Sequence, residues 1–423
     1  MSFPVASRRA FLGSTLAGLA ALPACAADSS GKSKDSRSSS RPDTLFLTWQ
    51  RDPTTTMTIQ WIGPALNPAD ATIHYAPSNG GAALNQATKA RPFPRSDLTL
   101  FRAELTRLHP GTTYDFRIGS HSTVYRFSTM PSKATDTIAF VSGGDCGTGD
   151  HAVAINHRVA RQDPMFAVIG GDLAYDDGKK TDTTLEFLRN YSREMVANND
   201  RLIPMVPCIG NHEVDGGYEK PRDKAPFFYA LFDGLFPETG FASLDFGDYL
   251  SLILLDTNHT TPIAGLQTDW LEKTLRARQD HPNVMVVNHV PAYPSHRKFE
   301  ASGSKEGTGE GNRRHWVPLF EKYRVPVVLE HHDHTFKRTK PMLGGMANAN
   351  GVLYLGDGSW GKLRAPQSPE SLPYLAASSE SYHFSLHRIQ GEQRFHLAMD
   401  EHGRVMDACL TGQRHSAPVR SAG

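Results

Sequence analysis

Cysteine is scarce in this sequence of 423 residues, which contains four cysteines and no pair spaced Cys-x-x-Cys. This absence argues against a thiolate zinc site and against an iron–sulfur cluster. Cys25 lies near the amino terminus, whereas Cys146 and Cys208 lie next to or within apolar runs. We therefore expect mainly free, packed thiols and predict no particular disulfide.

An excess of charge of either sign is also missing. The 45 lysines and arginines nearly balance the 44 aspartates and glutamates, which leaves a formal net charge of +1. Outside residues 28–41 there is no long basic run, so nothing indicates nucleic-acid binding. The length suffices for two domains, each with its own core.

A long apolar run is absent from the amino terminus, where the stretch from Ser14 to Ala24 is too short for a stable membrane span. Ser7-Arg8-Arg9-Ala10-Phe11-Leu12-Gly13 precedes it, so residues 1–27 match a twin-arginine export signal. We expect the twin-arginine export machinery as a partner and a periplasmic or extracellular location. Cleavage follows Ala26, or else Leu22-Pro23-Ala24-Cys25 acts as a lipobox and Cys25 carries a lipid anchor.

Residues 28–41 are rich in Ser, Lys and Arg and predict a flexible linker. Residues 42–132 change character, with short alternating runs such as 44–49, 57–61 and 71–75 between Pro, Gly and Asn turns. This pattern is typical of a β-sandwich. Residues 108–117 resemble the tyrosine corner of fibronectin type III domains, which predicts that the Tyr114 hydroxyl bonds back to nearby backbone.

The remaining region, residues 136–412, carries candidate metal ligands directly after five apolar runs of strand length. Such runs are typical of strands buried on both faces, and open α/β sheets place their sites at the carboxyl ends of strands. Residues 152–160 and 183–191 predict intervening helices, hence a layered α/β architecture. The blocks are Gly144-Asp145-Cys146-Gly147, Gly171-Asp172-Leu173-Ala174-Tyr175, Gly210-Asn211-His212-Glu213, Val286-Val287-Asn288-His289 and His332-Asp333-His334.

Carboxylate, amide and imidazole ligands suit cations such as iron, zinc and manganese. Two cations roughly 3.5–4 Å apart can orient a nucleophile and lower the pKa of a bound water. Each block alone has a simpler interpretation, because Gly-Asp often forms a turn, His-x-His often faces solvent and Tyr175 could be a packed core tyrosine. Five blocks in order, all at strand ends, favour a two-metal phosphoesterase site.

In this order the blocks resemble the purple acid phosphatases, the tyrosinate-bearing branch of the calcineurin-like metallophosphoesterases, over residues 137 to about 390. The resemblance implies a catalytic αββα sandwich, an α/β fold, behind the fibronectin III-like domain. It implies a dinuclear centre of Fe(III) with Fe(II), Zn(II) or Mn(II). One metal would be held by Asp145, Asp172, Tyr175 and His334, and the other by Asp172, Asn211, His289 and His332, with Asp172 bridging.

The resemblance also implies substrate contacts. His212 matches the family histidine that contacts phosphate or protonates the leaving group, a role that requires a pKa near the working pH. His296 lies where the family supplies substrate-contacting histidines, or it is an ordinary loop histidine. His331 replaces the usual glycine, so it is either strained at positive φ or an extra phosphate contact. With Asn211, these are the predicted substrate-binding residues, and His212 and His296 are the predicted catalytic ones.

The predicted function is hydrolysis of phosphate monoesters by a metal-bound hydroxide, that is, an acid phosphatase. A phosphodiesterase or nucleotide pyrophosphatase on the same residues is the first alternative. The alternative from another class is an exported adhesion or binding protein with a non-catalytic metal domain. Outside the ligand blocks, Asp256 is expected to form a turn, and His383 and His387 to be solvent-facing or structural.

Overall fold

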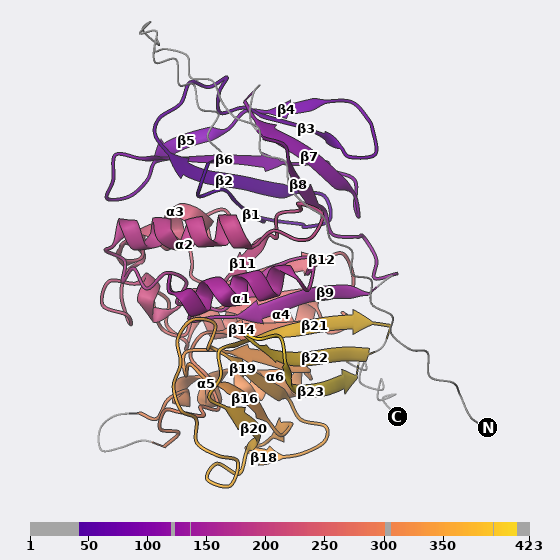
Figure 1. Cartoon of the computed structure of the whole chain (residues 1–423). Coiled ribbons are helices and arrows are strands. Elements are labelled where there is room, and N and C mark those ends of the chain that lie inside the picture. The colour runs from indigo at the N-terminus through magenta and orange to yellow at the C-terminus, as the bar shows by residue number, and fades with distance from the viewer. Residues whose placement is uncertain (1–41, 120–122, 136, 301–305, 392, 413–423) are drawn as a thin grey trace, which may run out of the picture. The chain divides into compact units, whose positions relative to one another are not determined.

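The structure is a computed structural model that describes residues 42–119, 123–135, 137–300, 306–391 and 393–412 (Figure 1). The predicted export signal, the linker and Cys25 lie outside the described residues. Within the described ranges, no helix combines the length and the apolar character needed to cross a membrane.

The amino-terminal region forms two four-stranded antiparallel sheets, as the alternating pattern predicts (Figure 1). The first has the order β1 (Phe46–Thr48), β2 (Met57–Gly63), β6 (Thr99–Leu105) and β5 (Lys89–Pro92). The second has the order β4 (Leu84–Gln86), β3 (Ile73–Pro77), β7 (Thr113–Ile118) and β8 (Tyr125–Ser128). The tyrosine corner is present, because the backbone N–H of His109 donates to the Tyr114 hydroxyl at 2.9 Å.

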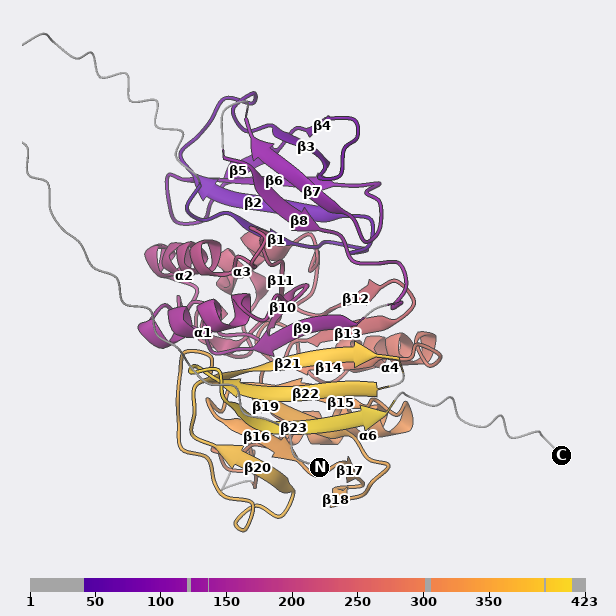
Figure 2. The ribbon, with the colours of Figure 1, turned by 45° about the vertical axis from the view of Figure 1, so that its right-hand side comes forward.

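The second region contains a six-stranded and a seven-stranded sheet (Figure 2). The six-stranded sheet has the order β11 (Met205–Pro207), β10 (Ala167–Ile169), β9 (Ile138–Gly143), β21 (His383–Gln390), β22 (Gln393–Asp400) and β23 (Val405–Gly412). The seven-stranded sheet has the order β12 (Ala242–Phe246), β13 (Leu250–Leu255), β14 (Val284–Asn288), β15 (Val327–Glu330), β19 (Leu353–Asp357), β16 (Phe336–Thr339) and β20 (Leu375–Ser379). A two-stranded hairpin, β17 (Met342–Leu343) with β18 (Met346–Ala347), is appended.

Helices pack on both sheets, and strand β13 shows why the apolar runs are continuous. Leu252 and Leu254 pack into the core shared with the six-stranded sheet, whereas Ile253 and Leu255 pack beneath helices α4 (Leu266–Ala277) and α6 (Val317–Lys322). Because successive side chains point to opposite faces, a strand buried on both sides needs an apolar residue at every position. The helices are α1 (Asp150–Ala160), α2 (Thr181–Glu194), α3 (Pro226–Phe232), α4 (Leu266–Ala277), α5 (Glu310–His315) and α6 (Val317–Lys322), with 3₁₀ turns η1 (Asn211–Glu213) and η2 (Arg222–Lys224).

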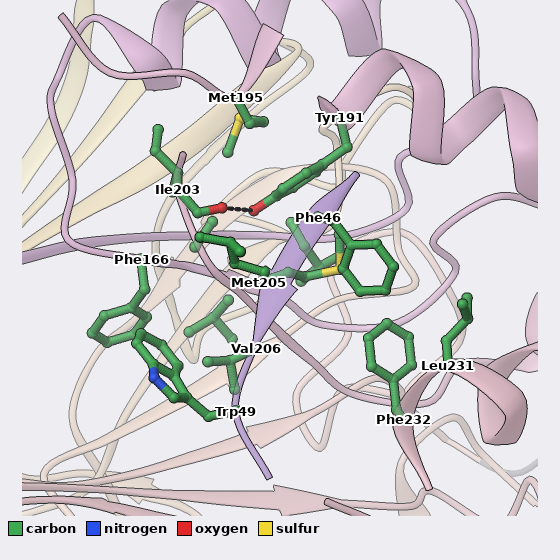
Figure 3. Packing of buried hydrophobic residues seen from close by; sticks show 14 of the residues in the cluster. Phe46, Trp49, Phe166, Tyr191, Met195, Ile203, Met205, Val206, Leu231 and Phe232 are labelled. Carbon is green, nitrogen blue, oxygen red and sulfur yellow. Dashed lines mark hydrogen bonds between the residues drawn. The ribbon is translucent and has the colours of Figure 1, made fainter. Parts of the chain in front are cut away.

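Strand β1 of the sandwich packs on the α/β region through aromatic side chains (Figure 3). The Phe46 ring lies 6.0 Å from that of Phe232, and the Trp49 ring lies 5.9 Å from that of Phe166, both edge to face. The Thr48 hydroxyl donates to the Met205 carbonyl at 2.8 Å. This apolar packing makes the sandwich a support for the strands that carry the candidate ligands.

Several residues that are not candidate ligands can be compared with their predicted roles. Cys146 and Cys208 are buried and form no disulfide within the described residues. Asp256 accepts backbone hydrogen bonds from His259, Thr260 and Thr261, as a turn residue does. His387 is fully buried, with Nε2 2.7 Å from the Ser142 hydroxyl. Of its two predicted environments, solvent-facing is therefore wrong and structural is confirmed.

Candidate metal centre

The five ligand blocks lie where parallel strands of the two sheets end. β9, β10 and β11 run parallel in one sheet, and β14 and β15 run parallel in the other. Their carboxyl ends are followed by Asp145, Asp172, Asn211, His289 and the segment His332–His334. Ligand atoms of Asp145, Asp172, His289 and His332 lie within 4.8 Å of one another, and all four residues are buried. The fold thus gathers side chains that are far apart in the sequence.

A first group of ligand atoms surrounds His289. Its Nε2 lies 3.2 Å from Asn211 Oδ1 and 3.1 Å from His332 Nδ1. Asp172 Oδ1 completes the group at 3.3 Å from the same Nε2. The other ring nitrogen, His289 Nδ1, donates to the Gly170 carbonyl at 2.9 Å. This outer hydrogen bond leaves the lone pair on Nε2, as a metal-binding imidazole requires.

A second group converges on Asp145 Oδ1. The Tyr175 hydroxyl lies 3.2 Å from that oxygen, and His334 Nε2 lies 3.0 Å from it. Tyr175 and His334 are themselves in contact at 3.0 Å. Burial and the Asp145 carboxylate raise the pKa of Tyr175 well above its ordinary value. A phenolate would therefore form at this position only against a strong positive charge.

Asp172 lies within 4.8 Å of Asp145 in the second group and of His289 in the first, and its two oxygens differ. Oδ1 accepts the backbone N–H of His212 at 2.8 Å, whereas Oδ2 is buried and has no hydrogen-bond partner among the described residues. Burial opposes ionisation of this carboxyl, but the neighbouring imidazoles, His289 foremost, hold its pKa well below the ordinary range. An ionised, buried oxygen without a donor fits a cation ligand. The donor set of carboxylate, amide, imidazole and phenol oxygen suits iron, zinc or manganese.

The backbone of the ligand loops is in an unusual conformation. Six non-glycine residues at the site have positive φ: Asp145 (57°), Asp172 (52°), Tyr175 (64°), Asp177 (55°), His332 (71°) and His334 (60°). Left-handed conformations cost free energy in residues that carry a Cβ, and they cluster where surrounding structure holds them for function. This clustering is independent support for a functional site at the strand ends.

Glycines let the loops approach one another. A Cβ on Gly210 would lie 2.4 Å from Asp172 Oδ1, and a Cβ on Gly171 would lie 2.6 Å from His289 Nδ1. Both distances are shorter than heavy atoms tolerate. These two glycines are therefore required by the close packing of the loops that follow β10, β11 and β14.

Glu213 ties these two loops together and was not among the predicted site residues. Its carboxylate accepts the backbone N–H of Asp172 at 2.8 Å, Leu173 at 2.7 Å and Gly210 at 2.7 Å. The side chain is buried. The signal was available in the Gly-Asn-His-Glu block, but the sequence does not show which backbone groups a buried glutamate satisfies.

His212 lies beside the ligand groups and is partly exposed. Its Nδ1 lies 2.6 Å from Asp177 Oδ1, and its ring centroid lies 4.2 Å from that of Tyr175. The Asp177 carboxylate also accepts from Lys180 at 2.7 Å. Because Asp177 occupies Nδ1, Nε2 is the nitrogen left to act on a substrate.

His296 and His331, which were also predicted to contact substrate, have hydrogen-bond partners outside the two ligand groups. His296 Nδ1 lies 2.7 Å from the Ala365 carbonyl, and the His296 N–H donates to Asp333 at 3.0 Å, so the structure links it to the loop of the His-x-His block. His331 is buried beneath the site, with Nδ1 3.1 Å from the Asn288 carbonyl and its ring against Gly170. The first alternative for His331, a strained backbone at positive φ, is not found, and His332 and His334 adopt that conformation instead. Its burial favours a packing position, and the phosphate contact stays a prediction.

Two cationic side chains on the loop after Trp360 also lie close to the second ligand group. Lys362 Nζ lies 4.4 Å from the centroid of the Tyr175 ring, and Arg364 Nε lies 3.2 Å from His334 Nδ1. No motif in the sequence indicated either residue, because their positions depend on how this loop folds back across the strand ends.

Comparison with known proteins agrees with this architecture. Residues 42–130 match the family model of the purple acid phosphatase N-terminal domain, and residues 135–336 match that of the calcineurin-like phosphoesterases. Purple acid phosphatase 21 of Arabidopsis thaliana is 27% identical over 280 residues, 62% of this chain and 60% of that protein. Acid phosphatase type 7 of Mus musculus is 23% identical over 406 residues, 86% of this chain and 90% of that protein.

Two solved structures share the fold. A purple acid phosphatase from yellow lupin (Lupinus luteus) seeds has a TM-score of 0.71 at 17% identity, with 87% of this chain and 74% of that chain covered. The structure of PhoD has a TM-score of 0.62 at 11% identity, with 90% of this chain and 93% of that chain covered.

Residues 135–336 thus form a metallophosphoesterase domain with candidate metal ligands at its strand ends. Within the metallophosphoesterases, the chain belongs to the purple acid phosphatase type, and that family implies a dinuclear metal centre.

Proposed function

We propose that the protein is an acid phosphatase that hydrolyses phosphate monoesters at a centre of Fe(III) and a divalent iron, zinc or manganese. The observation that carries this proposal is the pair of ligand groups, with Asp172 positioned between them and its Oδ2 without a donor among the described residues. Tyr175, Asp145 and His334 would hold one cation, and Asn211, His289 and His332 the other, with Asp172 shared. A bound cation pair supplies charge neutralisation and a water of lowered pKa.

The protein's own residues supply the rest of the chemistry. His212 would protonate the leaving oxygen through Nε2, while Asp177 accepts the Nδ1 hydrogen and fixes the ring orientation. Lys362 and Arg364 add positive charge beside Tyr175 and His334, where an anionic phosphate would enter. Glu213 holds the loops in register so that both ligand groups form together.

The purified protein, prepared aerobically without chelator, tests this proposal by its visible spectrum, its iron, zinc and manganese content, and its turnover of a phosphate monoester and a diester. A broad absorption in the green, iron plus a second metal, and monoester turnover are expected. If two metals are bound but the protein is colourless, Tyr175 is a packed side chain and not a metal ligand. Diester turnover above monoester turnover would favour a phosphodiesterase, and absence of both metal and turnover would favour a binding protein.

We also propose that residues 1–27 direct export to the periplasm or the outside of the cell. The twin-arginine pattern at Arg8 and Arg9 supports it. Fusing these residues to a reporter should move the reporter out of the cytoplasm in cells with twin-arginine machinery. Replacing both arginines with lysine should prevent this movement, and substituting Cys25 with serine tests the lipid anchor by detergent partitioning.

A further inference from the structure

Tyr218 lies against the first ligand group and is absent from every ligand block. Its hydroxyl lies 3.3 Å from Asn211 Oδ1 and 3.2 Å from His332 Nε2. A single phenol oxygen therefore contacts two side chains that the proposed function assigns to the same cation. The ring is partly exposed, so the contact is not forced by burial of the whole side chain in a core.

The direction of these hydrogen bonds follows from the imidazole of His332. Its Nδ1 faces His289 Nε2 at 3.1 Å, inside the ligand group, whereas its Nε2 faces Tyr218. An imidazole that offers Nδ1 to a metal carries its hydrogen on Nε2. That hydrogen is donated to the Tyr218 oxygen, and the Tyr218 hydroxyl in turn donates to Asn211 Oδ1. The hydroxyl acts as acceptor and donor at once, which fixes the tautomer of one ligand and the amide orientation of the other.

The loop that carries Tyr218 is held in place independently of its hydroxyl. Gly216 and Gly217 have φ of 99° and 77°, conformations that suit glycine and turn the chain back toward Asn211. The next two residues are anchored by backbone hydrogen bonds, Glu219 to the Asn258 carbonyl at 2.8 Å and Lys220 to the His259 carbonyl at 2.9 Å.

The Tyr218 ring also has a rigid support. Its centroid lies 4.9 Å from the ring of His259, which is fully buried and bonded on both nitrogens, to Thr257 and to the Gly217 carbonyl. Removing only the hydroxyl should therefore leave the ring and the loop where they are. This separates a role in positioning ligands from a role in folding.

We infer that Tyr218 is a positioning residue that orders Asn211 and His332 for one of the two cations. The inference rests on the proposed function for the assignment of those ligands. Outer hydrogen-bond partners of metal ligands typically change metal affinity by about 10–100-fold when removed. Tyr218→Phe should accordingly weaken one of two binding events by about this factor and leave the other unchanged.

The experiment is a calorimetric titration of the full-length, metal-depleted protein with Zn²⁺, together with thermal unfolding before metal is added. Tyr229→Phe is the matched control, because it removes another hydroxyl of this region, one bonded to Thr260 at 2.6 Å. The expected result is one weakened event in Tyr218→Phe, two wild-type events in Tyr229→Phe, and unchanged unfolding of metal-depleted Tyr218→Phe.

Two wild-type events in Tyr218→Phe would overturn the inference and leave the proposed function standing. Equal weakening of both events with a lowered unfolding temperature would also overturn it, by showing a general structural role. If the wild-type protein bound two zinc ions and the variant lost one, but neither hydrolysed phosphate esters, the positioning role would stand and the proposed activity would fall. A wild-type protein that bound no zinc would overturn both.

Discussion

Substituting Glu213 with glutamine should loosen the two ligand loops without changing side-chain size. The carboxylate accepts three backbone N–H groups, two on Oε2 and one on Oε1. A glutamine can place its carbonyl oxygen toward Asp172 and Gly210, but its NH₂ group then faces the Leu173 N–H, donor against donor. The Leu173 N–H loses its acceptor, and a buried donor left unsatisfied costs about 1–3 kcal/mol.

Hydrogen exchange measured by mass spectrometry is the suitable assay, because it reports the local opening free energy of the ligand loops separately from that of the rest of the protein. A loss of about 1–3 kcal/mol in the local opening free energy corresponds to roughly 5–150-fold faster exchange, since every 1.4 kcal/mol is tenfold. Peptides that contain Asp172, Leu173 and Gly210 should show this increase. Peptides of the sandwich strands should not change.

Glu272→Gln provides the control, because Glu272 pairs with Lys322 at 2.6 Å on the surface, away from the ligand loops. Its exchange pattern around Asp172 should equal that of the wild-type protein. If Glu213→Gln left the protection of these three amides unchanged, the hydrogen bonds of Glu213 would not hold the loops, and the account of how the two ligand groups form together would be wrong.

Asp172→Ala should abolish both metal occupancy and turnover, because it removes the carboxylate between the two ligand groups; turnover equal to wild type, measured with elemental analysis, would contradict the bridging assignment. Asp177→Asn should lower kcat by up to about 100-fold with little change in KM, because His212 loses its charged partner; an unchanged kcat would remove His212 as the proton donor. Burial, and then His387, hold the pKa of His396 well below its ordinary value of 6.5, so the folded state binds fewer protons than the unfolded state below that pH. The contribution of His396 to the free energy of unfolding is thus fully present above pH 6.5 and is lost as the pH falls toward the lower folded-state pKa. In His396→Gln, the denaturant midpoint should therefore decrease less between roughly pH 7.5 and 5 than it does in the wild-type protein. If the denaturant midpoint of His396→Gln changed with pH as it does in the wild-type protein, His396 would not be the group responsible for this pH dependence.

The strands and the ligand blocks were readable from the sequence because both depend on local pattern. Continuous apolar runs gave β9, β10, β11, β14 and β15, and the ligand-type residues follow them directly. The convergence of Tyr175 and His334 on Asp145 was available only through the family resemblance, since 159 residues separate the two. Sequence spacing does not encode such a contact.

What the sequence did not reveal are the partners of the ligands. Tyr218, Lys362 and Arg364 reach the site through loops whose course is set by glycine conformations and long-range hydrogen bonds. At His331, by contrast, the sequence suggested a special role that the structure does not show. A departure from the family pattern suggested strain or a substrate contact at that position, whereas the positive φ belongs to the following residue and the ring fills space under Gly170.

The six left-handed residues of the ligand loops place stability and activity in opposition. At each of these positions glycine, or in part asparagine, would suit the backbone better than the residue present. Such strained positions cost of order 1–3 kcal/mol each. A selection for thermal stability alone should therefore favour the loss of Asp145, Asp172, Tyr175 and the two outer histidines of the His332–His334 segment early, long before it touched the apolar strands. Variants recovered that way would keep the fold and lose the metal, so heat resistance by itself is a misleading criterion for improving this protein.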